Sequence, residues 1–158
     1  MTTTRRATAD DLEFLEHVFV LAADWRPGHE RGAQHWRADA SMGRYAGGFP
    51  RDTDLGFIAT REHEDVGAIW ARYFTEDDPG YGYVDDATPE LTLGVVPGRR
   101  GEGIGRALLN VMLAASTTDL SLSVEDGNPA IELYRKAGFV EVGRFGEATT
   151  MLHRRRVG

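Results

Sequence analysis

The chain has 158 residues, of which 41% are hydrophobic, and this is enough for one compact domain with a full apolar core. Its net charge of −7 argues against a nucleic-acid partner, because binding to phosphates needs an excess of Lys and Arg, and it favours a cationic partner instead. The absence of cysteine excludes disulfides, thiolate metal sites and a cysteine nucleophile.

No apolar stretch marks a leader or a membrane span. Residues 1–6 are polar and basic, and no apolar run approaches the roughly 18 residues that a span requires. We therefore expect a cytoplasmic protein with no membrane partner, folded as a single domain over residues 1–158. The five histidines show no metal-ligand spacing, so we predict no metal.

The first half of the chain predicts a strand, a helix and a hairpin. A strand is expected over residues 2–7, and Thr8 is a suitable N-cap for a helix that ends near Asp24. The segment from Trp25 to Asp54 is rich in Gly, Pro and Arg and predicts one short helix over about residues 33–42. Two apolar runs, 55–60 and 66–74, flank a charged segment and predict a β-hairpin.

The second half predicts two strand–helix units and a final β pair. The strands are expected at about 90–96, 120–124, 139–145 and 148–153. Apolar residues at helical spacing predict a helix over 104–115, and Asn128 as N-cap, Pro129 at the first position and Gly138 past the end frame a second, shorter one. This order describes an α/β fold (α+β), a mixed sheet flanked by helices.

Residues 98–106 place four glycines and three arginines between a strand and a helix. Glycine lets the backbone approach a ligand closely, and the free amides of a helix N-terminus suit an anion. The spacing excludes a Walker loop, because Ile104-Gly105 stands where Lys and Ser or Thr are needed, and it excludes the dinucleotide fingerprint. Phosphate binding and a plain strand-to-helix turn remain as the two interpretations.

The segment Arg100-Gly101-Glu102-Gly103-Ile104-Gly105 matches the pattern Q/R-x-x-G-x-G/A and resembles the GCN5-related N-acetyltransferase (GNAT) superfamily. The resemblance extends to residues 90–95, 128–139 and 6–12, and only about residues 25 to 55 lack it. It implies a GNAT-like acyl-CoA N-acyltransferase fold in which a splay between the fourth and fifth strands admits the pantetheine arm of CoA. It also implies acetyl-CoA as acyl donor and, by analogy, a homodimer through the C-terminal strands.

The resemblance implies that the pyrophosphate is held by the backbone amides of Arg100, Gly101, Glu102, Gly103, Ile104, Gly105 and Arg106, with the guanidiniums of Arg99, Arg100 and Arg106 adding charge. Val95 and Val96 would pair with the pantetheine as if it were a further strand, or else belong to an ordinary β-ladder. Asn128 would contact the CoA arm, although its N-cap position is an equally sufficient explanation.

Two residues are candidates for catalysis. Tyr134 matches the family tyrosine that donates a proton to the departing thiolate, and packing beside Leu133 is its alternative role. Glu90 resembles the glutamate that some members use, directly or through a water, as general base, and a solvated strand end is its alternative. A base is needed because an ammonium with a pKa near 10.4 is deprotonated in only about one molecule in a few thousand at neutral pH.

Residues for the acceptor are less defined. An acidic triplet and an acidic pair, with two tyrosines between them, either line a pocket for a cationic amine or form a solvated loop. They are Glu76-Asp77-Asp78 and Asp85-Asp86, with Tyr81 and Tyr83. Aromatic residues lie where the family builds its acceptor wall and serve equally as core: Trp25, Trp36, Tyr45 and Phe49. The sequence therefore predicts an N-acetyltransferase that moves the acetyl group of acetyl-CoA directly to a primary amine of an unidentified small-molecule, peptide or protein acceptor. The alternative is a non-catalytic acyl-CoA-binding sensor or assembly module of the same fold.

Overall fold

The computed structural model of the protein describes residues 1–156. Its elements are β1 (Thr2–Arg6), the 3-10 turn η1 (Ala9–Asp11), α1 (Leu12–Ala23), α2 (Ala33–Ala38), α3 (Ala40–Ala46), β2 (Leu55–Arg61), β3 (Glu64–Arg72), β4 (Glu90–Val95), α4 (Ile104–Ala115), β5 (Leu120–Glu125), α5 (Ala130–Lys136), β6 (Val140–Phe145) and β7 (Ala148–His153).

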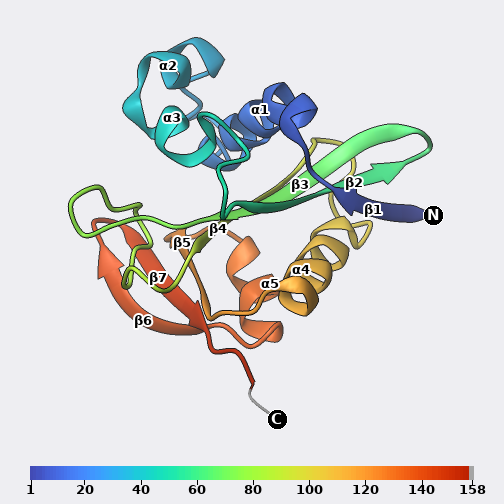
Figure 1. The fold of residues 1–158 in the computed structure, drawn as a ribbon. Coiled ribbons are helices and arrows are strands. Elements are labelled where there is room, and N and C mark those ends of the chain that lie inside the picture. The colour runs from blue at the N-terminus through green and yellow to red at the C-terminus, as the bar shows by residue number, and fades with distance from the viewer. Residues whose placement is uncertain (157–158) are drawn as a thin grey trace.

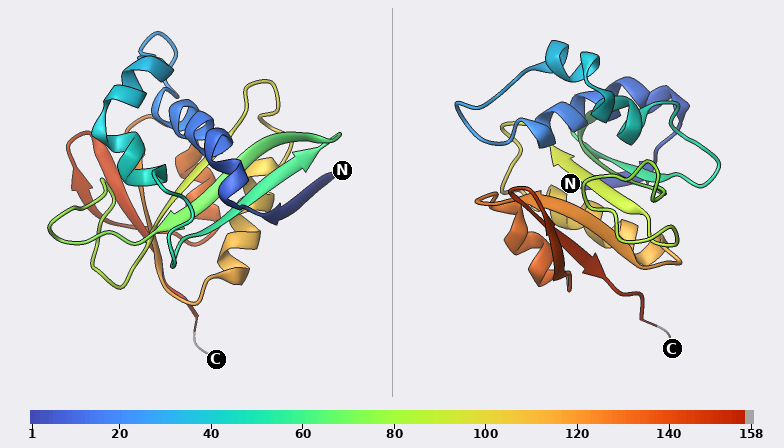
Figure 2. Two further views of the ribbon diagram at one scale, coloured as in Figure 1. Left: turned by 45° about the horizontal axis from the view of Figure 1, so that its top comes forward. Right: turned by 90° about the vertical axis from the view of Figure 1, so that its left-hand side faces the viewer.

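The strands form one mixed sheet in the order β1-β2-β3-β4-β5-β7-β6. All neighbours are antiparallel except β4 and β5, which are parallel. Helices α1, α2 and α3 lie on one side of the sheet, and α4 and α5 lie on the other (Figure 1). Two further views show the same layers (Figure 2). The predicted fold class, a mixed sheet flanked by helices, is confirmed.

Each face of the sheet has its own hydrophobic core, because successive strand residues point to opposite faces. In β3, Trp70 packs with Leu15 and Val18 of α1 and with the buried part of α3. The next residue on the other face, Ile69, packs with the apolar stripe of α4 instead. Gly94 of β4 allows α1 to approach closely, since a Cβ there would lie 2.7 Å from Cγ1 of Val18. The sheet is thus held between two independent apolar layers.

The segment predicted as one helix over 33–42 contains two helices, and this prediction is wrong. The chain breaks at Asp39, which has extended backbone angles of φ −90° and ψ 141° and whose side chain accepts a hydrogen bond from the Ser41 amide at 2.8 Å. Short polar side chains of this kind favour the N-cap over the helix interior. Asp39 therefore ends α2 and begins α3.

The predicted hairpin is present, with strands that extend closer to the turn than expected. Only Glu62 and His63 form the turn, with positive φ values of 55° and 68°. Two-residue hairpin turns of this hand match the twist of the strands they connect. The neighbouring charged residues therefore belong to β2 and β3 and not to a loop.

Candidate functional site

A gap opens between β4 and β5. Within residues 1–156, the register of the two strands joins only Glu90 to Ser121. On its other edge β4 pairs with β3 over its whole length, from Glu90 to Val95. The edge of β4 that faces β5 is therefore unpaired beyond its start, and Thr92–Val95 are partly exposed. Such an edge can accept an extended ligand as an additional strand.

Val95 and Val96 differ in what they offer to a ligand in this gap. The Val96 amide donates to the carbonyl of Val66 at 2.9 Å, so it belongs to the β-ladder and is not free. Successive residues of a strand direct their amide and carbonyl groups to opposite edges. Val95 thus directs its backbone groups toward β5. The Val96 amide thus belongs to an ordinary β-ladder, and pairing of Val95 with the pantetheine stays a prediction.

The glycine loop after β4 leads into the N-terminus of α4. Gly98, Gly101 and Gly103 have φ values of 88°, 82° and 82°, in the left-handed region that favours glycine. No backbone carbonyl within residues 1–156 accepts from the amides of residues 100–106, and no side chain caps α4. A Cβ at any of the three glycines would meet nothing within 4 Å. The loop therefore presents a row of free donors on open space, at the positive end of a helix dipole, and this fits a pyrophosphate.

The arginines of the loop are not equivalent. Arg99 lies 3.2 Å from a carboxylate oxygen of Glu62 and 3.7 Å from one of Glu64, so its charge is already paired with the β2–β3 hairpin. Arg100 and Arg106 are exposed. Arg99 is thus held by the hairpin, and the contribution of the three arginines to phosphate binding stays a prediction.

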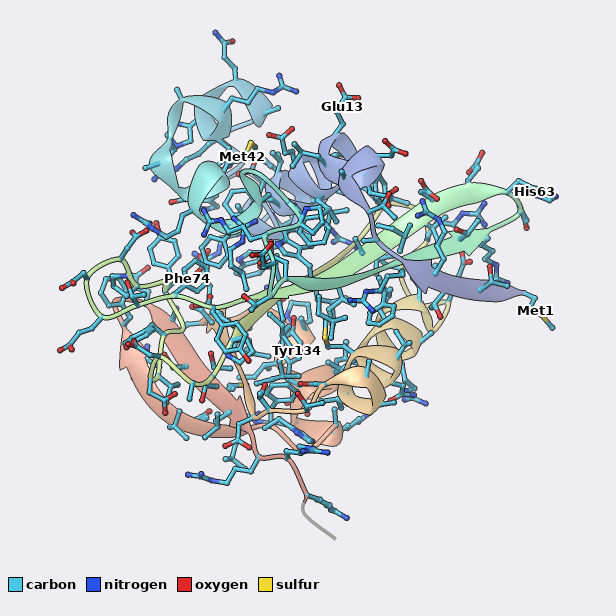
Figure 3. The ribbon with its side chains drawn as sticks, in the orientation of Figure 1. Met1, Glu13, Met42, His63, Phe74 and Tyr134 are labelled. Atoms are coloured by element: carbon cyan, nitrogen blue, oxygen red, sulfur yellow. The ribbon has the colours of Figure 1, made fainter. Side chains whose placement is uncertain are left out.

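Tyr134 lies in α5, on the α4 and α5 side of the sheet, and Phe74 lies on the opposite side (Figure 3). The Tyr134 side chain is 7% exposed, and its ring packs edge-on against Phe139 with 5.8 Å between centroids. The hydroxyl has no hydrogen-bond partner within residues 1–156 and is not fully enclosed by protein atoms. Burial raises the pKa of the phenol above its usual range, so the group stays protonated at neutral pH. The ring packs in the core while the hydroxyl is left free to donate.

Asn128 has a visible structural role. Its Oδ1 accepts a hydrogen bond from the Ala130 amide at 3.0 Å, and this caps the first turn of α5. The helix begins at Ala130, one residue after the Pro129 that the sequence places at its first position. Pro129 is the N-cap residue of α5, and Asn128 bonds to the first turn from the position before it, so a structural role of Asn128 is supported while contact with CoA stays a prediction.

Glu90 begins β4 on the face covered by α1 and α3, and it is only 3% exposed. Its Oε2 accepts a hydrogen bond from the Tyr45 hydroxyl at 2.5 Å, and its Oε1 accepts one from the Gly82 amide at 2.9 Å. Burial raises the pKa of this carboxyl to about 7, against the opposing effect of the two hydrogen bonds. The alternative of a solvated strand end is therefore wrong. A carboxyl with a pKa of about 7 suits a general base that acts near neutral pH.

The acidic loop before β4 packs directly against Glu90. A Cβ at Gly80 would lie 2.3 Å from Oε1 of Glu90, and one at Gly82 would lie 2.6 Å from the carbonyl carbon of Leu122 in β5. Only glycine lets the loop pass this close to both strands. The carboxylates themselves are exposed, and among them Asp78 pairs with Arg44 at 3.0 Å. They form a solvated rim beside the buried Glu90.

Of the predicted aromatic wall, Tyr45 and Phe49 are core residues with 4% and 3% exposure. Trp25 is partly buried, with its ring 3.8 Å from where a Cβ of Gly127 would lie. The neighbouring Arg26 donates to the Asp126 carbonyl at 3.0 Å, which ties the segment after α1 to the loop after β5. This contact crosses from one side of the gap to the other.

Sequence reasoning missed two residues beside Glu90. The sequence places Tyr45 in an acceptor wall or in the core, and its contact with Glu90 spans 45 positions of the chain. Ser121, the register partner of Glu90, is fully buried, and its hydroxyl has no hydrogen-bond partner within residues 1–156. The one local signal was the Gly80-Tyr81-Gly82 sequence, which marks a loop that passes close to other backbone.

Other parts of the described structure offer little for chemistry. Two surface hollows of about 100 and 360 Å³ lie beside Ser116 and Leu120, at the opposite end of α4 from the glycine loop. Within residues 1–156, no three His, Asp or Glu side chains gather in a way that would hold a metal ion. None of the helices in the same range is long and apolar enough to cross a membrane.

Comparison with known families identifies this arrangement. The model of the acetyltransferase (GNAT) domain matches residues 52–141, which is more than half of the chain and includes β4, the glycine loop and α5. The chain therefore belongs to the GNAT family of acetyltransferases and is an enzyme of that class. A comparison with curated protein sequences gave no significant match.

Solved structures agree on the fold. The PaiA N-acetyltransferase of Thermoplasma acidophilum, solved in complex with coenzyme A, has a TM-score of 0.71 and 20% identity, with 98% of this chain and 99% of that chain covered. The ribosomal-protein-alanine N-acetyltransferase of Brucella melitensis has a TM-score of 0.64 and 25% identity, with 96% and 99% covered. Mutant forms of the spermidine/spermine N-acetyltransferase SpeG from Vibrio cholerae have a TM-score of 0.62 and 19% identity, with 98% and 95% covered.

Proposed function

We propose that this protein transfers the acetyl group of acetyl-CoA directly to a primary amine, with both substrates bound at once. The observation that supports this most is the β4–β5 gap, with free loop amides at one end and a buried carboxyl at its start. In this arrangement the pyrophosphate lies on the amides of residues 100–106, and the pantetheine pairs with the free edge of β4 at Val95. The absence of cysteine from the sequence excludes a cysteine acyl intermediate.

Chemistry then needs one base and one proton donor. The amine nitrogen attacks the thioester carbonyl carbon, the new C–N bond forms, and the C–S bond breaks. Glu90 takes the proton that the amine loses. Because Glu90 is buried and each of its oxygens already accepts a hydrogen bond, the proton reaches it through a water molecule or after the loop at Gly80 to Gly82 shifts.

Tyr134 acts at the leaving group. Its hydroxyl has no competing partner within residues 1–156, so it is free to donate to the sulfur as negative charge develops there. The raised pKa of the phenol makes complete transfer to a thiolate with a pKa near 8.5 uphill. The contribution of Tyr134 is therefore a hydrogen bond that strengthens in the transition state.

The acceptor we propose is an amine carried by a cationic molecule. The supporting features are the net charge of −7 and the exposed carboxylates of the acidic loop beside Glu90, which include Glu76, Asp77 and Asp85. Complementary charge of this kind raises association rates and discriminates against anionic acceptors. The glycine loop and the gap would serve a non-catalytic module equally well, and the buried ionisable carboxyl of Glu90 at the start of the gap favours catalysis.

A direct assay tests the proposal. Purified protein is incubated with acetyl-CoA and a panel of polyamines, amino acids and basic peptides, with release of free thiol followed by a colorimetric reagent and the acetylated amine identified by mass spectrometry. The proposal predicts thiol release that depends on a cationic amine and yields its N-acetyl derivative. Binding of acetyl-CoA without thiol release for any amine would contradict it.

A further inference from the structure

We infer that Tyr45 is the positioning residue of this site: its hydroxyl holds the Glu90 carboxyl and the Gly80–Tyr83 loop in one arrangement and sets the pH at which the carboxyl accepts a proton. The inference rests on the proposed function, in which Glu90 is the base. Tyr45 comes from α3, in the part of the chain where the sequence offers no motif. It touches the base and the loop, and it acts on the reaction only through them.

The ring of Tyr45 is fixed by packing on several sides. Its centroid lies 5.1 Å from that of Phe74, 5.7 Å from that of Phe19 and 6.2 Å from that of Tyr81. The backbone carbonyl of the same residue accepts a hydrogen bond from the indole of Trp70 at 2.8 Å. Side chain and backbone are both held, so the hydroxyl has one available position.

That hydroxyl makes two hydrogen bonds with different tasks. It donates to Oε2 of Glu90 at 2.5 Å, and it accepts from the Tyr81 amide at 2.8 Å. The next amide along the chain, from Gly82, donates to the other oxygen of Glu90 at 2.9 Å. The phenol, the carboxyl and two loop amides thus form a closed set. If the phenol hydroxyl is removed, the Tyr81 amide and one oxygen of Glu90 lose their partner together.

The charge environment of Glu90 leaves Tyr45 as the adjustable element. On β3 its register partner is Arg72, whose guanidinium is already paired with Asp54 at 2.7 Å. On β5 its partner is the uncharged Ser121, and from the loop Tyr81 donates its amide to the Tyr45 hydroxyl.

The hydrogen bond from Tyr45 favours the ionised carboxyl, and burial opposes it. Loss of this hydrogen bond therefore raises the pKa of Glu90 further.

The test is the pH dependence of kcat/KM in the Tyr45→Phe variant. Wild-type activity is expected to rise with pH through a limb near pH 7, where Glu90 ionises. In Tyr45→Phe the limb moves upward by about one pH unit, the scale of a hydrogen bond to a charged group, so activity falls about tenfold at pH 6 and much less at pH 9. Tyr73→Phe is the matched control, because Tyr73 is partly buried and lines the smaller hollow, whereas the hydrogen bonds to the Glu90 carboxyl come from Tyr45 and Gly82. The pH profile of kcat/KM in Tyr73→Phe is expected to rise at the same pH as in the wild type.

Each outcome decides a different claim. A folded Tyr45→Phe enzyme with an unshifted limb and only lower stability overturns the positioning role and leaves the proposed function intact. Wild-type protein without any acetyl transfer overturns the proposed function first. If Tyr45→Phe does not fold, proton NMR of the wild type carries the test: a slowly exchanging Tyr45 hydroxyl signal must titrate with the same midpoint as activity, and a hydroxyl that does not titrate overturns the inference.

Discussion

Replacement of Glu90 by Gln is expected to stabilise the protein above pH 7 while it removes the base. The carboxyl has a pKa of 4.5 when unperturbed and about 7 in the folded protein, because burial disfavours its charged form. The folded state therefore holds the proton more tightly than the unfolded state. Its stability from this group is complete below pH 4.5, falls as the pH rises, and is lost above about pH 7.

The size of the effect follows from the shift. A difference of about 2.5 pKa units corresponds to roughly 3 kcal/mol of unfolding free energy, since each unit is worth about 1.4 kcal/mol. Glutamine is neutral at every pH and keeps an acceptor for the Gly82 amide. It offers a poorer partner to the Tyr45 hydroxyl, at a cost of about 1 kcal/mol that does not depend on pH. The informative quantity is thus the change with pH and not the absolute level.

Urea unfolding followed by circular dichroism between pH 5 and pH 8 measures this quantity. The stability of Glu90→Gln relative to wild type should increase by roughly 2–3 kcal/mol over that range. Glu13→Gln, at an exposed position of α1, is the control and should show no such trend. A constant difference between Glu90→Gln and wild type across the range would refute the reasoning about the buried carboxyl.

Two further predictions concern catalysis and stability. Tyr134→Phe is expected to lower kcat by about tenfold to a hundredfold, at or below the lower end of the range for general acid catalysis, and to leave the Kd for acetyl-CoA nearly unchanged. Steady-state kinetics measures kcat and calorimetry measures the Kd. Unchanged turnover would remove Tyr134 from the mechanism. Asp54→Ala is expected to lower the unfolding free energy by roughly 3–5 kcal/mol, because it leaves the guanidinium of Arg72, 1% exposed, without its carboxylate. A loss below about 1 kcal/mol in urea unfolding would show that water reaches this pair.

Local signals in the sequence predicted most of the elements and the binding loop. The glycines at 98, 101 and 103 and the apolar stripe of α4 are properties of neighbouring residues, and the structure has the loop and helix where these predict them. The break at Asp39 was missed because the apolar spacing on both sides is helical, and the N-cap interaction of one side chain outweighs it.

The environment of Glu90 was not accessible to the same reasoning. Its burial depends on Tyr45, which is 45 positions away, and on a loop that can pass over it only because Gly80 and Gly82 lack side chains. Nothing near Glu90 in the sequence distinguishes a buried carboxyl from a solvated one. The different states of Arg99 and Arg106 likewise depend on the hairpin carboxylates that lie beside the loop in the fold. Tertiary contacts, and not propensities, decide these features.

Isothermal titration of the purified protein tests whether the glycine loop and the free edge of β4 bind acetyl-CoA. We expect micromolar binding by the wild type, loss of binding in Gly103→Val, and retained binding in Gly28→Val. Gly28 has a φ of 83° in open space, almost the same as Gly103, but lies outside the loop. No binding at millimolar acetyl-CoA, or equal affinity in Gly103→Val and wild type, would show that the glycine loop is not the binding site.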